Sequence, residues 1–137
     1  MKKILLILAV AGLCTAACAQ TDKKGVAFQE TTMAELQKQS ADTGKPIFVD
    51  VYATWCGPCK YMANNVFTQD KAGAYFNANF VNAKFDAEKG EGREVARKYQ
   101  VTAYPTFLIL DSDGKELGRV VGGAEVDDFI RKVQGLL

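Results

Sequence analysis

The feature that most constrains this chain is a pair of cysteines, Cys56 and Cys59, that follows directly on an apolar run. The run covers residues 46–53 (PIFVDVYA), and its β-branched and aromatic residues predict a buried strand. Two cysteines separated by two residues can close into a small disulfide or open to a dithiol. The sequence therefore predicts a strand that delivers a cysteine pair, with thiol–disulfide exchange as the candidate chemistry.

The residues after the first cysteine predict a helix. Pro58 is tolerated in a first helical turn, because its missing N–H would have had no partner there. Cys56 is then expected at the helix N-terminus, where unpaired backbone N–H groups and the helix dipole favour a thiolate. Cys59 is expected one turn further on and more deeply buried. We therefore assign Cys56 as the nucleophile and Cys59 as the resolving thiol.

Two other uses of this pair compete with exchange chemistry. The chain has four cysteines and no histidine, and only two of the cysteines lie outside the N-terminal segment. A structural zinc site needs four such ligands, so no metal site is expected. A purely structural disulfide stays open as an alternative, although so small a loop gains little from chain entropy.

Residues 1–19 have the layout of a secretory signal peptide. Lys2 and Lys3 precede an almost wholly apolar stretch at 4–13, and small residues follow up to Ala19. The apolar stretch is too short to span a bilayer comfortably, which disfavours a retained anchor. The sequence thus predicts an exported protein in a compartment where disulfides are made and reshuffled, which in a bacterium is the periplasm.

The end of this leader allows two processing routes. The triplet Ala17-Cys18-Ala19 fits the small-x-small pattern and would give a soluble product that starts at Gln20. Alternatively, residues 15–18 (TAAC) resemble a bacterial lipobox, which would place a lipid anchor on Cys18. Removing residues 1–19 takes away two lysines and changes the net charge from +1 to −1. No nucleic-acid partner is expected at that charge.

We expect a flexible tether at residues 20–25 and a single domain at 26–137, because strands and helices alternate along the chain. Thr32 and Glu35 match a helix-capping box, and residues 111–114 (DSDG) match a hairpin turn. Strands are predicted over residues 26–28, 47–53, 80–86, 106–110 and 116–121, and helices over 33–41, 59–66, 71–78, 94–99 and the stretch containing Val126, Phe129, Ile130 and Val133. This order, βαβ followed by ββα, predicts a compact three-layer α/β domain.

The hexapeptide Trp55-Cys56-Gly57-Pro58-Cys59-Lys60 resembles the thioredoxin active site residue for residue. The resemblance extends over about residues 45–137 and implies the thioredoxin fold, a central mixed sheet flanked by helices on both faces. Residues 44–46 (GKP) and 76–81 (FNANFV) are similar to one branch of the family. That branch contains exported bacterial thioredoxin-like proteins and the carboxy-terminal periplasmic domain of thiol:disulfide interchange reductases.

The resemblance and the residues agree on Asp50. Thioredoxins carry a buried acid six residues before the first cysteine, and a carboxylate in so apolar a run is desolvated, which raises its pKa. Asp50 is then expected to exchange a proton with Cys59. Lys84 matches a lysine that thioredoxins place near that acid. A half-exposed aspartate and a solvated lysine on ordinary strands are the alternatives.

Further site residues come from the resemblance. Pro105 matches the family's cis-proline, whose neighbouring backbone pairs with an extended substrate segment. Tyr104 departs from the smaller residue common before that proline, and Gly122 resembles a glycine that lines the substrate groove. Trp55 is expected to shield Cys56, with core packing as its alternative. Gly57, Pro58 and Lys60 complete the surround of the cysteines.

The expected function is an exported thiol–disulfide oxidoreductase that reduces protein disulfides. It needs no dissociable cofactor, but a redox donor must return electrons to the pair, and a membrane electron conduit is the candidate by resemblance. A disulfide oxidase or isomerase is the alternative within the same chemistry. A copper-handling chaperone that uses Cys56 and Cys59 as soft ligands is the alternative from another class.

Overall fold

The structure, a computed structural model, describes residues 24–137. The predicted signal peptide at 1–19, the lipidation candidate Cys18 and residues 20–23 of the predicted tether lie outside the described residues. The helices are α1 (Met33–Thr43), α2 (Gly57–Tyr61), the π-helix η1 (Met62–Val66), α3 (Asp70–Asn79), α4 (Glu91–Lys98) and α5 (Val126–Gln134), and the strands are β1 (Ile47–Tyr52), β2 (Val81–Asp86), β3 (Thr106–Leu110) and β4 (Glu116–Val121).

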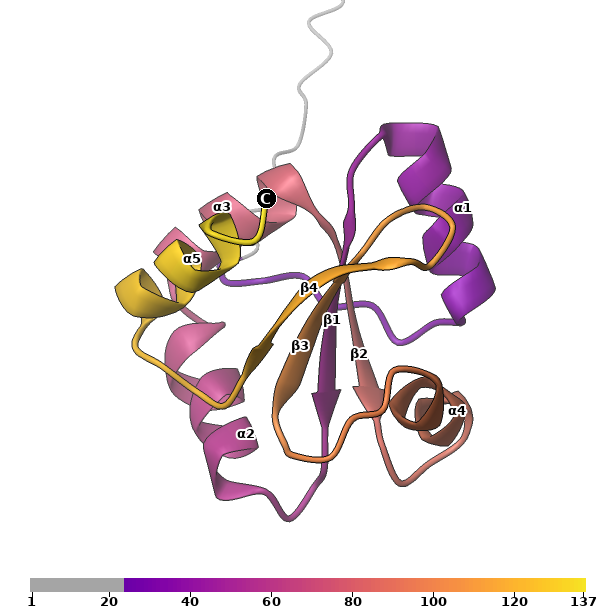
Figure 1. The fold of residues 1–137 in the computed structure, drawn as a ribbon. Helices are drawn as coiled ribbons and strands as arrows, with labels where there is room; N and C mark the ends of the chain where they lie inside the picture. The colour runs from indigo at the N-terminus through magenta and orange to yellow at the C-terminus, as the bar shows by residue number, and fades with distance from the viewer. Residues whose placement is uncertain (1–23) are drawn as a thin grey trace, which may run out of the picture.

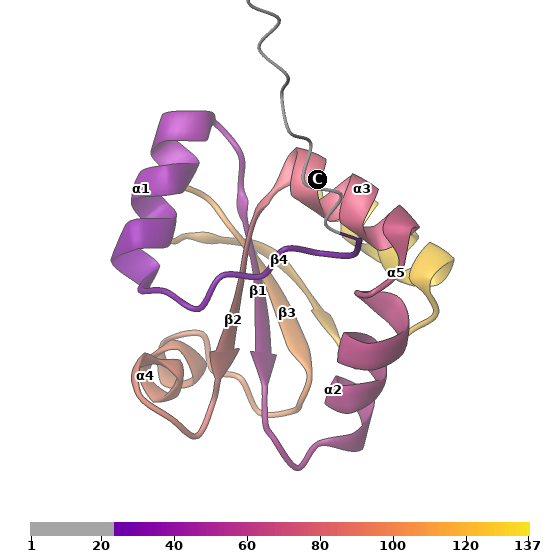
Figure 2. The same cartoon turned by 180° about the vertical axis from the view of Figure 1, so that it is seen from behind.

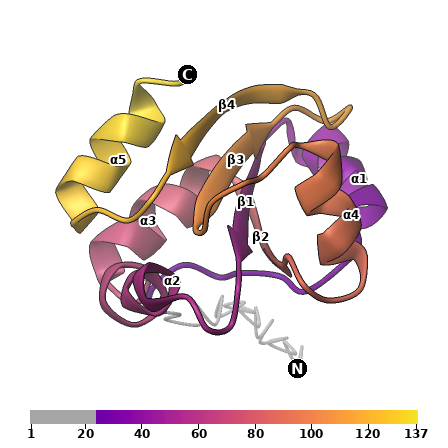
Figure 3. The same cartoon turned by 60° about the horizontal axis from the view of Figure 1, so that its bottom comes forward.

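The four strands form one mixed sheet in the order β2-β1-β3-β4. Strand β1 runs parallel to β2 and antiparallel to β3, and β3 pairs antiparallel with β4. Helices α1 and α4 cover one face of the sheet, and α2, α3 and α5 cover the other (Figures 1 and 2). Figure 3 looks along the layers and shows the sheet between the two sets of helices. The predicted fold class is confirmed.

Alternation along β1 divides the core between these two faces. Ile47, Val49 and Val51 pack with residues of α1 and α4 in an aliphatic cluster. Phe48 projects from the opposite face into a cluster supplied by η1, α3 and α5 and rich in phenylalanine. Each helical layer thus buries an apolar stripe against one side of the same strand, and β1 is fixed from both sides.

The helix after the cysteine pair is less regular than predicted. It begins as α2, continues as the π-helix η1 and stops before α3 starts at Asp70. The backbone N–H of Phe67 donates to Met62 O at 2.9 Å, a bond over five residues that widens the last turn. Apolar positions at helical spacing could not predict that change, because the same side chains face the core in both helix types.

The N-terminal segment differs from the edge strand predicted at residues 26–28. Val26 donates its backbone N–H to Phe67 O at 2.8 Å, outside the sheet. Pairing with β2 is confined to an isolated parallel bridge between Gln29 and Ala83. Gly25, the last residue of the predicted tether, is buried, and its φ of +80° favours glycine. The packed part of the chain therefore includes at least one residue before 26.

Helix α4 begins at Glu91, three residues earlier than predicted. The apolar pattern of this helix starts only at Val95, but two contacts fix its first turn. The carboxylate of Glu91 accepts the backbone N–H of Met33 at 3.0 Å, which ties α4 to the start of α1. Gly92 packs so closely on the backbone of Asp86 that no side chain would fit there. Both contacts are tertiary and carry no local sequence signal.

Candidate active site

The two cysteines lie at the start of α2, shortly after the end of β1, and they are joined as a disulfide with Cα atoms 5.2 Å apart. Cys56 is the N-cap residue of α2. Its Sγ accepts the backbone N–H of Cys59 at 3.2 Å. An N–H group that would otherwise lack a partner thus points at the Cys56 sulfur, and this contact favours negative charge there.

Burial does not distinguish the two cysteines as expected. Cys56 is 4% exposed and Cys59 is 6% exposed, so the prediction that Cys59 lies deeper is wrong for the disulfide form. Tyr104, where the family commonly has a smaller residue, packs against the cluster that contains both cysteines. The difference between the two sulfurs is therefore one of hydrogen bonding, since only Cys56 caps the helix.

Asp50 is buried in the middle of β1, as predicted from the apolar run around it. Its Oδ1 has no hydrogen-bond partner within residues 24–137. Burial raises the pKa of this carboxyl to about 7, and the charge of Lys84 opposes that rise. The half-exposed alternative for Asp50 is thereby excluded, and the carboxyl can exchange a proton near neutral pH.

Lys84 lies opposite Asp50 in the register of β1 and β2. Its ammonium group is nevertheless 3.5 Å from Glu30 Oε1, on the segment that precedes α1, and 5.9 Å from the ring centre of Tyr52. Both members of the ion pair are partly exposed, the Glu30 side chain more so. Lys84 therefore influences Asp50 through its charge and leaves the carboxyl without a direct ion pair.

A pocket of about 210 Å³ connects these groups. Asp50, Cys59 and Lys84 line it together with Lys60, which projects from α2. The structure thus brings the buried acid and the predicted resolving cysteine to one cavity. Asp50 is therefore a candidate acceptor for the proton of Cys59.

On the other side of the cysteines lies the segment before β3. The Tyr104–Pro105 peptide bond is cis, in agreement with the family resemblance. Gly122, directly after β4, donates its backbone N–H to Pro105 O at 2.9 Å. Its φ of +87° lies in the left-handed region that other residues rarely adopt, so the backbone conformation at this position favours glycine.

Trp55 is an exposed residue, with 67% of its surface accessible, so the alternative of core packing is excluded. Its indole N–H donates to Glu88 Oε1, on the loop before α4. Its ring stands edge-on to Tyr104, with ring centres 6.0 Å apart. Trp55 therefore reaches the cysteine cluster through Tyr104.

Sequence reasoning missed four residues around the cysteines: Glu30, Tyr61, Glu88 and Glu125. The Tyr61 hydroxyl donates to Glu125 Oε1 at 2.5 Å, which joins α2 to the residue before α5. The hydrogen bond with Glu125 raises the pKa of the Tyr61 phenol. Helical spacing from Gly57 could have placed Tyr61 near the site. The three glutamates carry no such signal, because their partners lie far away in sequence.

Within residues 24–137, no group of three or more His, Cys, Asp or Glu side chains lies close enough together to hold a metal ion. None of the helices in that range is both long and apolar enough to cross a membrane.

The sequence of the whole domain matches a known family model. The model for the thioredoxin-like domain covers residues 33–135, which includes the cysteine pair, Asp50, Lys84, Pro105 and Gly122. The expected resemblance is therefore confirmed over nearly all of the described chain.

Three individual proteins are also similar to this chain. Thioredoxin H2-2 of Oryza sativa subsp. japonica is 38% identical over 114 residues, which are 82% of this chain and 79% of the rice protein. Thiol:disulfide interchange protein DsbD of Yersinia pestis is 32% identical over 120 residues, covering 84% of this chain but only 20% of its own length. The solution structure of a candidate disulphide-isomerase from Bacteroides thetaiotaomicron is 42% identical, with a TM-score of 0.75, and the match covers 82% of this chain and 93% of that one.

Proposed function

This chain belongs to the thioredoxin-like family and is a thiol–disulfide oxidoreductase, and from that premise we propose that it is exported and reduces protein disulfides. The main support for a reductase rather than an oxidase is the buried carboxyl of Asp50, which lines one pocket with Cys59. Strongly oxidising members of this class are oxidants because their reduced form is stabilised. Here an anionic Asp50 disfavours a thiolate on Cys59, which lines the same pocket. The reduced pair is therefore a good electron donor.

The proposed reaction has two exchange steps. The Cys56 thiolate, stabilised by the N–H of Cys59, attacks one sulfur of a substrate disulfide, and the other substrate sulfur leaves as a thiolate. The Cys59 thiolate then attacks the Cys56 sulfur of this mixed disulfide. The second substrate sulfur leaves, the substrate is reduced by two electrons and the Cys56–Cys59 disulfide forms.

Asp50 takes part in the second step. Cys59 must lose its proton before it can attack, and Asp50 shares its pocket and has a pKa raised by burial to about 7. A carboxylate with that pKa accepts a proton from a thiol near neutral pH more readily than an ordinary aspartate does. Lys84 moderates the pKa of Asp50 through its charge, and Lys60 lies at the side of the same pocket.

The substrate segment is proposed to bind in extended form beside Pro105. The backbone around Tyr104 and Pro105 would pair with that segment as an added strand, with Gly122 alongside. Gly57 and Pro58 form the exposed first turn of α2 next to Cys56, and Trp55 stands at the margin of the same surface. Disulfide-containing proteins are thus the substrate class.

The sequence and the relatives support a proposed place of action and a proposed electron donor. A signal peptide at residues 1–19 would take the chain to the periplasm, with Cys18 as the point of a lipid anchor if it is processed as a lipoprotein. The similarity to DsbD supports re-reduction of the Cys56–Cys59 disulfide by a membrane electron conduit. No dissociable cofactor enters the two exchange steps.

Disulfide isomerisation is the second candidate. The Bacteroides thetaiotaomicron protein described as a candidate disulphide-isomerase is 42% identical to this chain. An isomerase needs the same first attack by Cys56, followed by release without net oxidation of the pair. The two functions differ in the reduction potential that suits them.

The reduction potential of the Cys56–Cys59 couple tests the proposed direction. The protein would be equilibrated in glutathione and dithiothreitol buffers of graded potential, and the fraction of free thiols counted after alkylation. We expect a midpoint below roughly −200 mV, on the side of thioredoxin at about −270 mV. A midpoint near roughly −120 mV would identify an oxidase instead.

Alkylation and trapping test the roles of the two cysteines. At low pH, limiting alkylation of the reduced protein should label Cys56 and spare Cys59, because only Cys56 caps the helix. Cys59→Ser should accumulate a mixed disulfide with substrate through Cys56, and Cys56→Ser should accumulate little. Preferential labelling of Cys59 would reverse the two assignments.

A further inference from the structure

Helix α2 carries a second polar contact two residues beyond the cysteine pair. The Tyr61 hydroxyl donates to Glu125 Oε1 at 2.5 Å, a bond between residues 64 positions apart in the sequence. The two side chains line an open groove of about 490 Å³. The other lining residues are Gly57, Pro58, Gly123 and Ala124.

The groove is continuous with the surface proposed to bind substrate. Gly57 and Pro58 are the two residues between the cysteines, so the groove begins beside Cys56. Figure 1 shows the connection from β4 to α5 running alongside α2. Contact there is close, since a Cβ at Gly123 would lie 3.3 Å from Met62 Sδ. A chain bound at the cysteines and extended along α2 therefore meets Tyr61 and Glu125.

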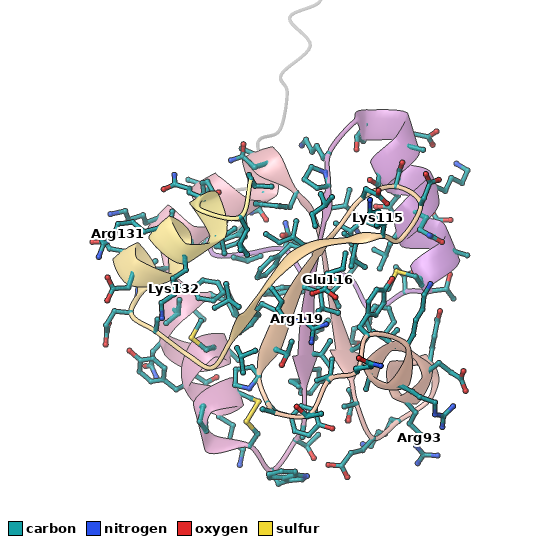
Figure 4. All side chains as sticks on the ribbon, in the orientation of Figure 1. Arg93, Lys115, Glu116, Arg119, Arg131 and Lys132 are labelled. Atoms are coloured by element: carbon teal, nitrogen blue, oxygen red, sulfur yellow. A yellow bond between two sulfur atoms is a disulfide. The ribbon has the colours of Figure 1, made fainter. Side chains whose placement is uncertain are left out.

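Glu125 differs from the neighbouring acids in having no cation of its own. Asp127 pairs with Lys71, and Asp128 pairs with Arg131, which is labelled on α5 in Figure 4. Within residues 24–137 no ion pair involves Glu125 at 4 Å or less, and no hydrogen bond from those residues reaches its Oε2.

Lys60, the lysine next to Tyr61 in the sequence, does not pair with Glu125. Lys60 lines the pocket that holds Asp50 and Cys59, whereas Tyr61 lines the groove with Glu125, so the two side chains lie on different sides of α2. The carboxylate of Glu125 is thus oriented by one hydrogen bond and retains acceptor capacity for a charged donor.

We propose that Glu125, oriented by Tyr61, selects disulfide substrates that carry a lysine or arginine close to the reactive cysteine. This inference rests on the proposed function and names the substrate class of the same site. The cationic side chain would lie along the groove and donate to Glu125 while the substrate cysteine faces Cys56. A neutral residue at that position leaves the charge of Glu125 unmatched, and an acidic one is repelled.

The test uses extended peptides joined as symmetric disulfide dimers, so that attack on either sulfur is equivalent. Members of the series differ only in one residue, Lys, Gln or Glu, placed in turn at each position flanking the cysteine. The second-order rate constant for oxidation of the reduced protein is measured for each peptide. At the best position we expect the Lys peptide to react roughly twofold to fivefold faster than the Gln peptide, the size expected for a solvent-exposed ion pair.

Two variants and a matched control locate the effect. Glu125→Gln should bring the Lys-to-Gln rate ratio to about one, and Tyr61→Phe should lower that ratio while retaining the carboxylate. Asp127→Asn removes the same charge from the adjacent helix and should keep the wild-type ratio. Raising the salt concentration should reduce the ratio in the wild type.

The outcomes distinguish a failure of the proposed selectivity from a failure of the proposed reductase function. Equal rate constants for Lys and Gln peptides at every position would overturn the selectivity while leaving reduction intact. A ratio lost equally in Asp127→Asn would overturn the assignment to Glu125. Absence of reaction with all peptides would overturn the proposed function, and this inference with it.

Discussion

Phe48 and Asp50 project from the same face of β1, two residues apart, into opposite surroundings. The Phe48 ring lies 4.5–6.3 Å, centre to centre, from those of six other phenylalanines. The Asp50 carboxyl is as inaccessible to water as many core residues, yet its Oδ1 has no hydrogen-bond partner in the described part of the chain. Strand β1 therefore carries Phe48, whose burial stabilises the fold, and, two residues later, Asp50, whose burial costs free energy.

The contrast shows how the fold can hold an unfavourable group beside its cysteines. Burying a carboxyl without a partner costs free energy, and neutralisation by a proton is the usual response. The phenylalanine cluster around Phe48 stabilises the same strand. Stability and reactivity are thus supplied by neighbouring residues of β1 and can be separated by mutation.

The largest expected effect comes from emptying the packed position. Phe48→Ala removes a ring that contacts several elements and should lower the free energy of unfolding by about 3–5 kcal/mol. Denaturant unfolding of the oxidised protein, followed by circular dichroism, measures the change. The midpoint potential should change little as long as the variant remains folded. A loss below about 1 kcal/mol would mean that the cluster can close over the gap.

Asp50→Asn should have an effect of opposite sign that depends on pH. The pKa of Asp50 is about 7 in the folded protein against an ordinary value of 3.8, so the folded state holds its proton more tightly than the unfolded chain does. The wild type should therefore lose stability as the pH rises from about 4 through 7, while the variant does not. At 1.36 kcal/mol per unit, the difference should reach about 4 kcal/mol above pH 8 and vanish near pH 4.

The same variant tests the proton transfer. Asparagine keeps the shape of the side chain but accepts no proton, so resolution of the mixed disulfide should slow more than the first attack by Cys56 does. Single-turnover kinetics of both steps, with unfolding curves at several pH values, give the two readouts. A stability difference independent of pH, together with unchanged kinetics, would contradict the assignment of Asp50.

Lys84→Met is the companion to that variant and should give the smallest effect. It removes the charge that opposes the raised pKa of Asp50, so in this variant the loss of stability with rising pH should begin at the same pH as in the wild type but continue to a higher pH. The partly exposed ion pair with Glu30 should contribute little by itself, within about 1 kcal/mol. In the Asp50→Asn background the pH shift should disappear, because there is no carboxyl left to titrate.

Local patterns predicted most of the fold. Strands β3 and β4 begin and end where the apolar and turn residues place them, and the Thr32 hydroxyl accepts the N–H of Glu35 at 3.2 Å as the capping box requires. The π-helical turn at η1 was missed, because the same apolar side chains face the core in an α-helix and in a π-helix. The early start of α4 was missed, because the contact with α1 that fixes it lies far away in sequence.

The candidate site divides in the same way. The burial of Asp50 followed from its apolar neighbours, and Cys56 at the start of a helix followed from Pro58. The similar burial of the two cysteines was missed, since it depends on the side chains packed around them, Tyr52 and Tyr104 among them. The contact between Tyr61 and Glu125 joins two segments that only the completed fold brings together.

The segment before α1 also has a mechanical consequence. It is attached at three separate places: Val26 bonds to the backbone of Phe67, Ala27 to the side chain of Asn77, and Gln29 to β2. A force applied at the N-terminus, as from a tethered chain, is therefore shared among several bonds before it reaches α1. The domain should therefore resist extraction from that end as a unit.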